Sequence, residues 1–239
     1  MFRTLIWFIY FCLYQVFIFP SLLKANRLAA DNRTAELDVL ANATAVPWSL
    51  SLLKLAGCRV HVTGAENIPQ NTPVLFVSNH QSNFDIPILM AHTDRPTGFI
   101  AKESLEKIPL VSQWMRHIHC VFIKRGSPRD AAAAINQGVR FLKSGYSMVI
   151  FPEGTRSKDG FLQEFKPGAL KLATKAGVPM VPVTISGSIN MMRKGSFVIH
   201  PSDVELIISP AIMPESYETT DTVVLSDQVK TIIEGHLTH

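Results

Sequence analysis

The chain has 239 residues, of which 47% are hydrophobic, and its formal net charge is +4 at pH 7. This length allows one substantial domain with a short additional segment. The mild positive charge fits an anionic partner such as a membrane surface or a phosphorylated substrate, and it fits equally a protein with no polyanionic partner. Because no basic run with interleaved aromatic residues occurs, we expect no nucleic acid partner.

The first element in the chain is an uncharged segment at residues 4–23, TLIWFIYFCLYQVFIFPSLL. As a helix it would be roughly 30 Å long, about the thickness of the hydrocarbon core of a bilayer. It predicts a membrane anchor, with a cleaved signal peptide or a buried helix of a soluble protein as alternatives. Tyr10, Tyr14, Gln15 and Pro20 also fit a helix that enters one leaflet or lies in the interface.

Basic residues are more frequent after this segment than before it. Lys24, Arg27 and Arg33 follow it, whereas Arg3 and the α-amino group precede it. The positive-inside rule then places the rest of the chain in the cytoplasm. The three cysteines are far apart, so they predict reduced thiols and neither a zinc site nor a disulfide framework. We therefore expect a membrane-associated protein whose active domain is on the cytoplasmic face of the plasma (inner) membrane.

A second apolar stretch lies at residues 46–57, where Trp48, Leu52 and Leu55 follow helical spacing. It predicts either a second helix lying on the membrane or an amphipathic helix packed on the core. These patterns predict N-terminal membrane-anchoring helices at residues 1–57 and an α/β domain at residues 58–239.

Short apolar segments alternate with helical patterns from Cys58 onward. Strands are expected at residues 60–63, 74–78, 98–101, 121–124, 148–151, 181–186 and 204–209. One expected helix has Ser127 as its N-cap and Pro128 at its first position, and it stops at Gly145. Two more are expected near residues 167–176 and 222–237. This alternation predicts an α/β fold with a single mixed sheet flanked by helices.

The stretch SNHQSNFD, residues 78–85, follows the second expected strand. On one continuous helix the side chains of His80 and Asp85 would diverge by about 140°. A turn between strand and helix would instead let Asp85 fold back onto His80. The carboxylate could then accept from one ring nitrogen and leave the other free to take a proton. Alone, this H-x4-D pattern fits a polar loop with a helix cap as well.

The sequence offers no nucleophilic serine to go with this pair, because no G-x-S-x-G motif occurs. A His–Asp pair without an enzyme nucleophile suits direct attack by a substrate hydroxyl.

The heptapeptide FPEGTRS, residues 151–157, follows the fifth expected strand. Gly154 allows close backbone approach, Thr155 offers a hydroxyl, and Arg156 offers a fork of donors suited to phosphate. We expect Glu153 to orient Arg156 or a substrate hydroxyl. For the heptapeptide alone, a solvated turn with a surface ion pair is the alternative.

Together these segments resemble the 1-acylglycerol-3-phosphate acyltransferases of the glycerolipid acyltransferase superfamily. The first block of that family, N-H-x4-D, corresponds to Asn79, His80 and Asp85. The third corresponds to residues 151–156 with the downstream FKPGA, and the fourth, V-P-V, to residues 181–183. The resemblance covers most of the chain after about Ala65.

The second block of the family, K-x2-L-x3-P followed by a later arginine, matches Lys102, Leu105 and Pro109, and then Arg125 in VFIKR. The family often has glycines after this proline and before the next strand, where this chain has Ser112 and His119. This departure concerns local packing or the shape of the acyl pocket, because neither residue is a motif ligand.

The resemblance implies acyl transfer from the thioester of acyl carrier protein or coenzyme A to the sn-2 hydroxyl of lysophosphatidic acid. The product would be phosphatidic acid, made for phospholipid synthesis without a metal, an organic cofactor or an acyl-enzyme intermediate. His80 would be the general base and Asp85 would orient it. The residues implied to hold the substrate phosphate are Arg156, Lys102 and Arg125, and those implied to shape the site are Asn79, Glu153, Gly154 and Thr155.

Other functions remain open at this point. The acceptor could be another lysolipid, although Lys102 and Arg156 favour one with a phosphate. A metal-dependent hydrolase could use His80 and Asp85 as ligands, but the sequence has no further His/Asp cluster to complete the site. A non-catalytic lipid-binding protein of the membrane would need no base, so the His–Asp pair argues against it.

Overall fold

The computed structural model describes residues 1–124, 126–217 and 219–237. Within these residues a seven-stranded sheet has the order β1-β7-β6-β2-β5-β3-β4. The strands are β1 (Cys58–Thr63), β2 (Leu75–Ser78), β3 (Thr97–Lys102), β4 (Val121–Ile123), β5 (Ser147–Ile150), β6 (Met180–Ser186) and β7 (Ser202–Ile208). β2 is central and runs parallel to β5 and β6, while β7 is antiparallel to β6. The predicted single mixed sheet is confirmed.

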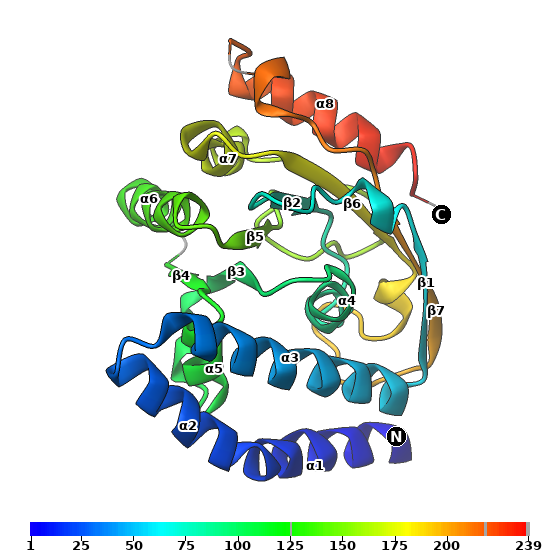
Figure 1. The fold of residues 1–239 in the computed structure, drawn as a ribbon. Helices are drawn as coiled ribbons and strands as arrows, with labels where there is room; N and C mark the ends of the chain where they lie inside the picture. Colours follow the sequence, from blue (N-terminus) through cyan, green and yellow to red (C-terminus); the bar gives the residue numbers. More distant parts are fainter. Residues whose placement is uncertain (125, 218, 238–239) are drawn as a thin grey trace.

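Helices cover both faces of this sheet (Figure 1). One face carries the N-terminal helices with α4 and α5, and the other carries α6, α7 and α8. The helices are α1 (Phe2–Phe17), α2 (Phe19–Ala30), α3 (Thr34–Ala56), α4 (Asp85–His92), α5 (Val111–His117), α6 (Pro128–Lys143), α7 (Lys171–Ala176) and α8 (Thr222–Glu234). Two separate apolar clusters fill the two interfaces.

Local signals explain where several of these helices begin and end. The Ser127 hydroxyl accepts from the amide of Asp130 at 3.2 Å and caps α6, whose first residue is Pro128. α7 ends at Gly177, whose φ of +70° is a left-handed conformation that glycine adopts without strain. These boundaries agree with the sequence prediction.

The N-terminal apolar run is not one straight helix, contrary to the expectation for residues 4–23. α1 ends at Phe17, α2 begins at Phe19, and the two helices are bent by 48° relative to each other. Pro20 lies in the first turn of α2, where its missing amide is tolerated, but its ring disfavours a helix that continues from the preceding turn. Among the described residues, α3 is long and apolar enough to cross a membrane, and the bent pair α1 and α2 qualifies only if it is counted as one broken span.

Of residues 46–57, the first eleven belong to the C-terminal half of α3 and Gly57 caps it, so the helix is longer than the sequence pattern indicated. Leu52 and Leu53 are buried, and Leu52 accepts a hydrogen bond from Trp7 Nε1 at 3.0 Å through its carbonyl oxygen. These side chains belong to the same apolar cluster as Phe76 and Phe84 of the α/β part. The N-terminal helices therefore share a core with the sheet, and the division of the chain into two domains stays a prediction.

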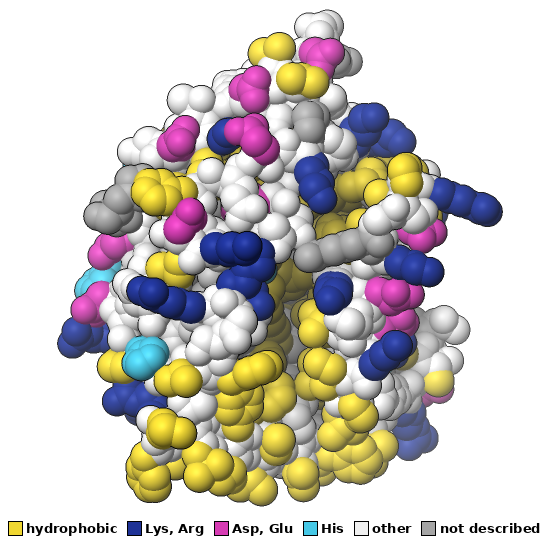
Figure 2. Space-filling model, turned by 180° about the vertical axis from the view of Figure 1, so that it is seen from behind, with side chains coloured by type: hydrophobic (Ala, Val, Ile, Leu, Met, Phe, Trp, Pro, Cys, Tyr) yellow, Lys and Arg dark blue, Asp and Glu magenta, His cyan; other side chains and the backbone are white. Residues whose placement is uncertain are grey.

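The outward face of α1 remains hydrophobic. Its exposed side chains include Phe2, Leu5, Ile9, Leu13 and Val16. Figure 2 shows hydrophobic side chains gathered at the lower end of the molecule, the side where α1 and α2 lie in Figure 1. α1 thus buries one stripe against the protein and presents the other outward.

Candidate active site

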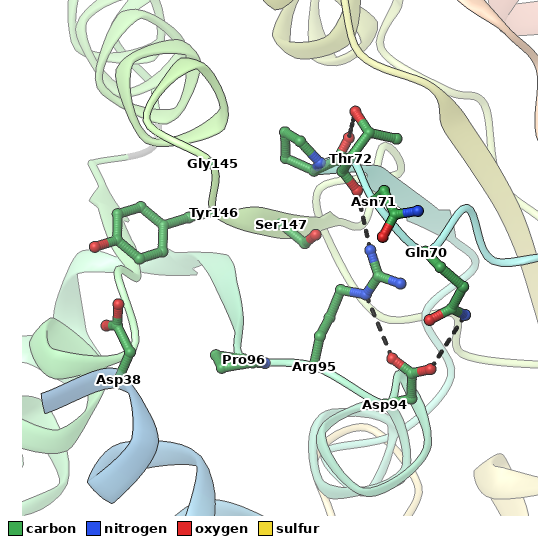
Figure 3. Close-up of a pocket in the computed structure, with 11 residues that line it drawn as sticks. Asp38, Gln70, Asn71, Thr72, Asp94, Arg95, Pro96, Gly145, Tyr146 and Ser147 are labelled. Atoms are coloured by element: carbon green, nitrogen blue, oxygen red, sulfur yellow. Dashed lines mark hydrogen bonds and ion pairs between the residues drawn. The ribbon is translucent and has the colours of Figure 1, made fainter. Parts of the chain in front are cut away.

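A cavity of about 540 Å³ lies at the amino ends of the parallel strands (Figure 3). Its polar groups pair with one another: Arg95 Nη1 donates to the carbonyl of Thr72 at 3.0 Å, and Gln70 Nε2 donates to Asp94 Oδ2 at 3.3 Å. None of the described residues that the sequence predicts for catalysis or phosphate binding lines it. The residues predicted for the site follow the other ends of these strands.

The carboxyl ends of β2, β3, β4 and β5 meet at one edge of the sheet, because these strands are parallel. His80 follows β2, residues 151–156 follow β5, and Lys102 is the last residue of β3. Functional groups in open α/β sheets gather at this edge. The topology thus brings together segments that are far apart in the sequence.

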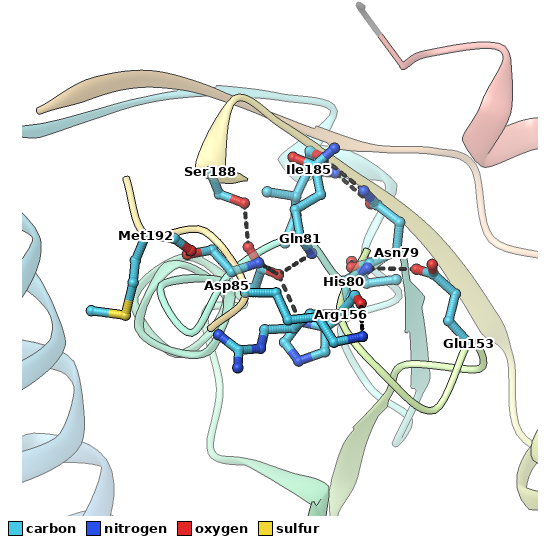
Figure 4. Close-up of polar contacts among 12 residues, drawn as sticks. Asn79, His80, Gln81, Asp85, Glu153, Arg156, Ile185, Ser188 and Met192 are labelled. Atoms are coloured by element: carbon cyan, nitrogen blue, oxygen red, sulfur yellow. Dashed lines mark hydrogen bonds and ion pairs between the residues drawn. The ribbon is translucent and has the colours of Figure 1, made fainter. Parts of the chain in front are cut away.

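His80 and Asp85 are in direct contact there (Figure 4). Asp85 is the first residue of α4, and the turn before it folds the carboxylate back, so that Oδ2 lies 2.7 Å from His80 Nδ1. The amides of Gln81 and Ser82 donate to the same oxygen at 2.7 and 2.9 Å, and the Ser188 hydroxyl donates to Oδ1 at 2.5 Å. Asp85 is completely buried among these donors.

This arrangement determines which ring nitrogen of a neutral His80 carries the hydrogen. The carboxylate of Asp85 acts as an acceptor toward every partner, so His80 Nδ1 carries the hydrogen and Nε2 keeps its lone pair. Nε2 is the ring nitrogen that does not contact Asp85. Nε2 is therefore available to accept a proton from a bound molecule.

Phe151 and Glu153, the first and third residues of FPEGTRS, fix the position of His80. The Phe151 ring stacks on the imidazole with the centroids 4.0 Å apart. The His80 amide donates to Glu153 Oε1 at 2.7 Å, and the His80 carbonyl accepts from the amide of Ser157 at 2.7 Å. Ring and backbone are thus both held by the segment after β5.

Glu153 is mostly buried, and both its oxygens accept from backbone amides. Oε2 accepts from Gln163 at 3.1 Å, in addition to the contact of Oε1 with His80. The sequence predicts Arg156 or a substrate hydroxyl as its partner, whereas these contacts are with the backbone of His80 and Gln163. Burial raises the pKa of Glu153 to about 7, although the two amides favour the ionised form and partly oppose this effect.

Asn79 joins β2 to β6 just before His80. Its Nδ2 donates to the carbonyl of Ile185 at 2.8 Å, and its Oδ1 accepts from the Ile185 amide at 2.8 Å. Because both groups are buried, this paired contact holds the end of β2 in register beside β6.

The turn at residues 154–156 is held from two sides. Gly154 has a φ of +69°, and a Cβ at this position would lie 2.9 Å from Lys166 Nζ. Lys194 Nζ donates to Thr155 Oγ1 at 2.9 Å and to the carbonyl of Arg156 at 2.8 Å. Three lysine and arginine side chains therefore lie at or next to this turn.

Arg156 immediately precedes Ser157, whose amide contacts the His80 carbonyl, so Arg156 and His80 lie on adjoining segments. Lys102 is exposed at the end of β3, in register with Ile123 at the end of β4. Arg125, the third cation expected to hold the phosphate, lies outside the described residues.

The acyltransferase family model matches residues 59–186, a range that contains His80, Asp85 and Arg156. The chain belongs to the acyltransferase family.

Relatives of this acyltransferase are similar over most of its length. A 1-acyl-sn-glycerol-3-phosphate acyltransferase from Borreliella burgdorferi is 34% identical over 74% of this chain and 72% of the relative. A chloroplastic enzyme of the same name from Brassica napus is 39% identical over 64% of this chain and 45% of the relative. The chain thus spans less than half the length of this plant relative.

A solved structure is similar over nearly the whole acyltransferase chain. It is the crystal structure of the 1-acyl-sn-glycerophosphate acyltransferase PlsC from Thermotoga maritima, with a TM-score of 0.85 and 31% sequence identity. The match covers 98% of this chain and 92% of the other, so it includes the N-terminal helices as well as the sheet.

Two residues of the acyltransferase site, Ser188 and Lys194, are not predicted by the sequence. Ser188 contacts Asp85 from the segment after β6, and Lys194 contacts the turn at residues 154–156. Neither belongs to a motif that predicts chemistry. Their roles follow only from contacts between segments remote in the sequence.

The departure at His119 has a structural explanation. His119 has a φ of +61°, a conformation that glycine adopts without strain. Its ring packs on Tyr146 with centroids 3.6 Å apart, and its Nε2 lies 3.2 Å from Asp38 Oδ1. His119 is thus held between α3 and the residue that precedes β5. The described part of the chain contains no group of three or more potential ligands of His, Cys, Asp or Glu type.

Proposed function

We propose that this acyltransferase transfers a fatty acyl group from a thioester to the sn-2 hydroxyl of 1-acylglycerol 3-phosphate, forming phosphatidic acid for phospholipid synthesis. The observation that carries the proposal is the contact of 2.7 Å between His80 Nδ1 and Asp85 Oδ2 beside the Arg156 segment. The names of relatives that match most of their own length support the acceptor.

His80 is proposed as the general base. The acceptor hydroxyl donates to Nε2, and its oxygen attacks the thioester carbonyl while its proton passes to Nε2. Asp85 stabilises the imidazolium that forms. The tetrahedral intermediate then collapses, the carbon–sulfur bond breaks, and the thiolate leaves and takes the proton, so no acyl-enzyme intermediate is needed.

The phosphate of the acceptor is proposed to bind Arg156 and Lys102, with Arg125 as a third cation. Arginine suits phosphate because its fork of donors can bind two oxygens at once. A phosphate fixed in this way would hold the sn-2 hydroxyl near His80 and convert the reaction into one between oriented groups.

Either acyl carrier protein or coenzyme A is proposed to supply the thioester, with no metal or organic cofactor. The enzyme is proposed to work on the cytoplasmic face of the plasma (inner) membrane, where its acceptor and product are lipids. The hydrophobic outward face of α1 supports this membrane association.

The test uses purified protein in detergent, given labelled acyl thioester and lysophosphatidic acid with and without a chelator. We expect phosphatidic acid to form at the same rate in both samples. His80→Ala should lower kcat by at least about 10²-fold and retain lysolipid binding, since general base catalysis typically contributes 10²–10⁴-fold. Full activity of this variant would refute the mechanism, and loss of activity with chelator would favour the metal-dependent alternative.

A further inference from the structure

The segment at residues 191–200, between β6 and β7, is exposed and hydrophobic at its tip. Phe197 is 72% exposed and Val198 is 38% exposed. Removing a large aromatic side chain from water is favourable, because its apolar surface is better accommodated in an apolar phase. The tip therefore suits contact with an apolar phase.

The 191–200 segment is anchored to α1 on one side. The Ile199 amide donates to Thr4 Oγ1 at 2.9 Å, and the Phe197 ring lies 6.4 Å from the Phe8 ring. Thr4 and Phe8 flank the outward hydrophobic face of α1. The exposed tip is thus continuous with the surface that this helix presents outward.

The same segment is anchored to the candidate active site on its other side. The Ser82 hydroxyl donates to the Met192 carbonyl at 3.0 Å. Lys194 Nζ donates to Thr155 Oγ1 and to the Arg156 carbonyl. The 191–200 segment therefore connects α1 with the turn before α4 and with the turn at residues 154–156, which lie on either side of His80.

Positive charge accompanies the apolar tip. Arg193 is exposed within the segment. A cavity of about 760 Å³, bordered by the residues that follow the segment, is lined by Arg3, Lys54 and Arg59, with Asp203 paired to Arg59. In Figure 2, Lys and Arg side chains lie just above the hydrophobic lower end, on either side of a hollow with hydrophobic walls. Apolar side chains below a belt of cations match the apolar core and anionic surface of a lipid bilayer.

We propose that the 191–200 segment is a second bilayer-contacting element beside α1, with Phe197 and Val198 entering the interface of an anionic membrane and Arg193 facing its head groups. The inference rests on the proposed function, in which the acceptor is a membrane lipid. It places the entrance to the site at the bilayer surface, because the segment that contacts the lipid also contacts the turn that carries Arg156.

The test compares Phe197→Ser with Val224→Ser in the full chain. Val224 is a matched control, since it is 60% exposed on α8, at the end of the molecule opposite α1. Flotation is measured with neutral phosphatidylcholine vesicles and with vesicles that also contain phosphatidylglycerol. We expect Val224→Ser to bind like the wild type and Phe197→Ser to partition roughly tenfold more weakly. Equal binding of the two variants would overturn the proposal.

A charge variant tests the electrostatic part. Arg193→Gln should weaken binding to phosphatidylglycerol-containing vesicles several-fold and leave binding to neutral vesicles unchanged. Unchanged binding to the anionic vesicles would overturn the role of Arg193. If Phe197→Ser changed the oligomeric state in detergent and left vesicle binding intact, the segment would be a self-association surface and the bilayer proposal would be wrong.

Acylation rates distinguish failure of the bilayer-contact proposal from failure of the proposed function. Phe197→Ser should slow acylation of a long-chain lysolipid in vesicles and leave acylation of a short-chain, monomerically dissolved lysolipid unchanged. Equal losses in both assays would overturn the bilayer role. Failure of the wild type to acylate either lysolipid would instead count against the proposed function, whatever the vesicle binding.

Discussion

Asp85 is held by donors other than His80, and this determines how the pair behaves. The amides of Gln81 and Ser82 and the hydroxyl of Ser188 hold the carboxylate in place independently of the imidazole. His80, itself held by Phe151 and Glu153, therefore meets a carboxylate that is already in place. Preorganisation of this kind avoids a reorganisation cost when the imidazolium forms.

Replacing Asp85 with Asn should impair turnover far more than binding. The amide is of similar size, but its NH₂ group would face donors or allow the wrong imidazole tautomer, so Nε2 would no longer be the proton acceptor. We expect kcat for phosphatidic acid formation to fall by about 10³-fold or more while lysolipid binding is retained. Circular dichroism controls for folding, and a folded variant within tenfold of the wild-type rate would contradict this role.

Glu153 should make stability depend on pH. Its pKa is raised from 4.5 to about 7, so the folded state binds more protons than the unfolded state between these values. Its stabilising contribution is present below pH 4.5 and is lost as the pH rises through 7, a loss of up to about 3 kcal/mol. Glu153→Gln should remove this part of the dependence. Thermal unfolding at pH 5 and pH 8 checks it, and identical pH dependence in both proteins would contradict it.

Lys194 should act as a positioning residue for the phosphate-binding turn. Lys194→Met keeps the aliphatic stem but removes two charge-assisted hydrogen bonds to the turn at residues 154–156. We expect KM for lysophosphatidic acid to rise about tenfold or more, with a smaller change in kcat. Lys175→Met on α7 is the matched control, because Lys175 contacts Asn136 on the opposite face of the sheet. An unchanged KM in Lys194→Met would exclude this role.

At the scale of elements, one face of α1 packs against the protein and the other is proposed to contact the membrane. Trp7 is buried against α3, donates to the Leu52 carbonyl and packs on Phe84 at 5.4 Å, whereas Ile9 is half exposed on the outward face. Trp7→Ala should lower the free energy of unfolding by about 3–5 kcal/mol. Ile9→Ala should hardly change it but should weaken vesicle binding. Thermal unfolding in detergent and flotation measure the two effects, and equal destabilisation by both variants would contradict the division.

Elements with strong local signals could be predicted from the sequence. The seven strands follow apolar runs, α6 follows its Ser127 cap, and α7 stops at Gly177. The start of α3 at Thr34 was missed, because residues 34–45 lack a clear apolar stripe. The bend after Phe17 does not follow from composition, because uniform hydrophobicity favours one helix and only Pro20 indicates a break.

The candidate site could be predicted only where motifs mark it. His80 and Asp85 are five residues apart, and a turn between them could be inferred from spacing alone. Ser188 and Lys194 could not, since their partners are 103 and 39 residues away in the chain and depend on the order of the strands. Sequence patterns predict local geometry, whereas the contacts of Ser188 and Lys194 arise from tertiary packing.

At the scale of the whole molecule, the 191–200 segment with its exposed Arg193 contacts α1. Hydrophobic side chains gather at the lower end of the molecule, with Lys and Arg side chains just above them (Figure 2). If this end meets an anionic bilayer, salt should weaken the encounter, because the Debye length shortens from roughly 10 Å at 0.1 M to roughly 3 Å at 1 M. Turnover of long-chain lysolipid in phosphatidylglycerol-containing vesicles should therefore fall several-fold as NaCl rises from about 0.1 to 1 M. In neutral vesicles the same titration should have little effect, because apolar insertion does not depend on charge. An equal fall in both vesicle types would assign the salt effect to the phosphate-binding cations instead of the surface that meets the membrane.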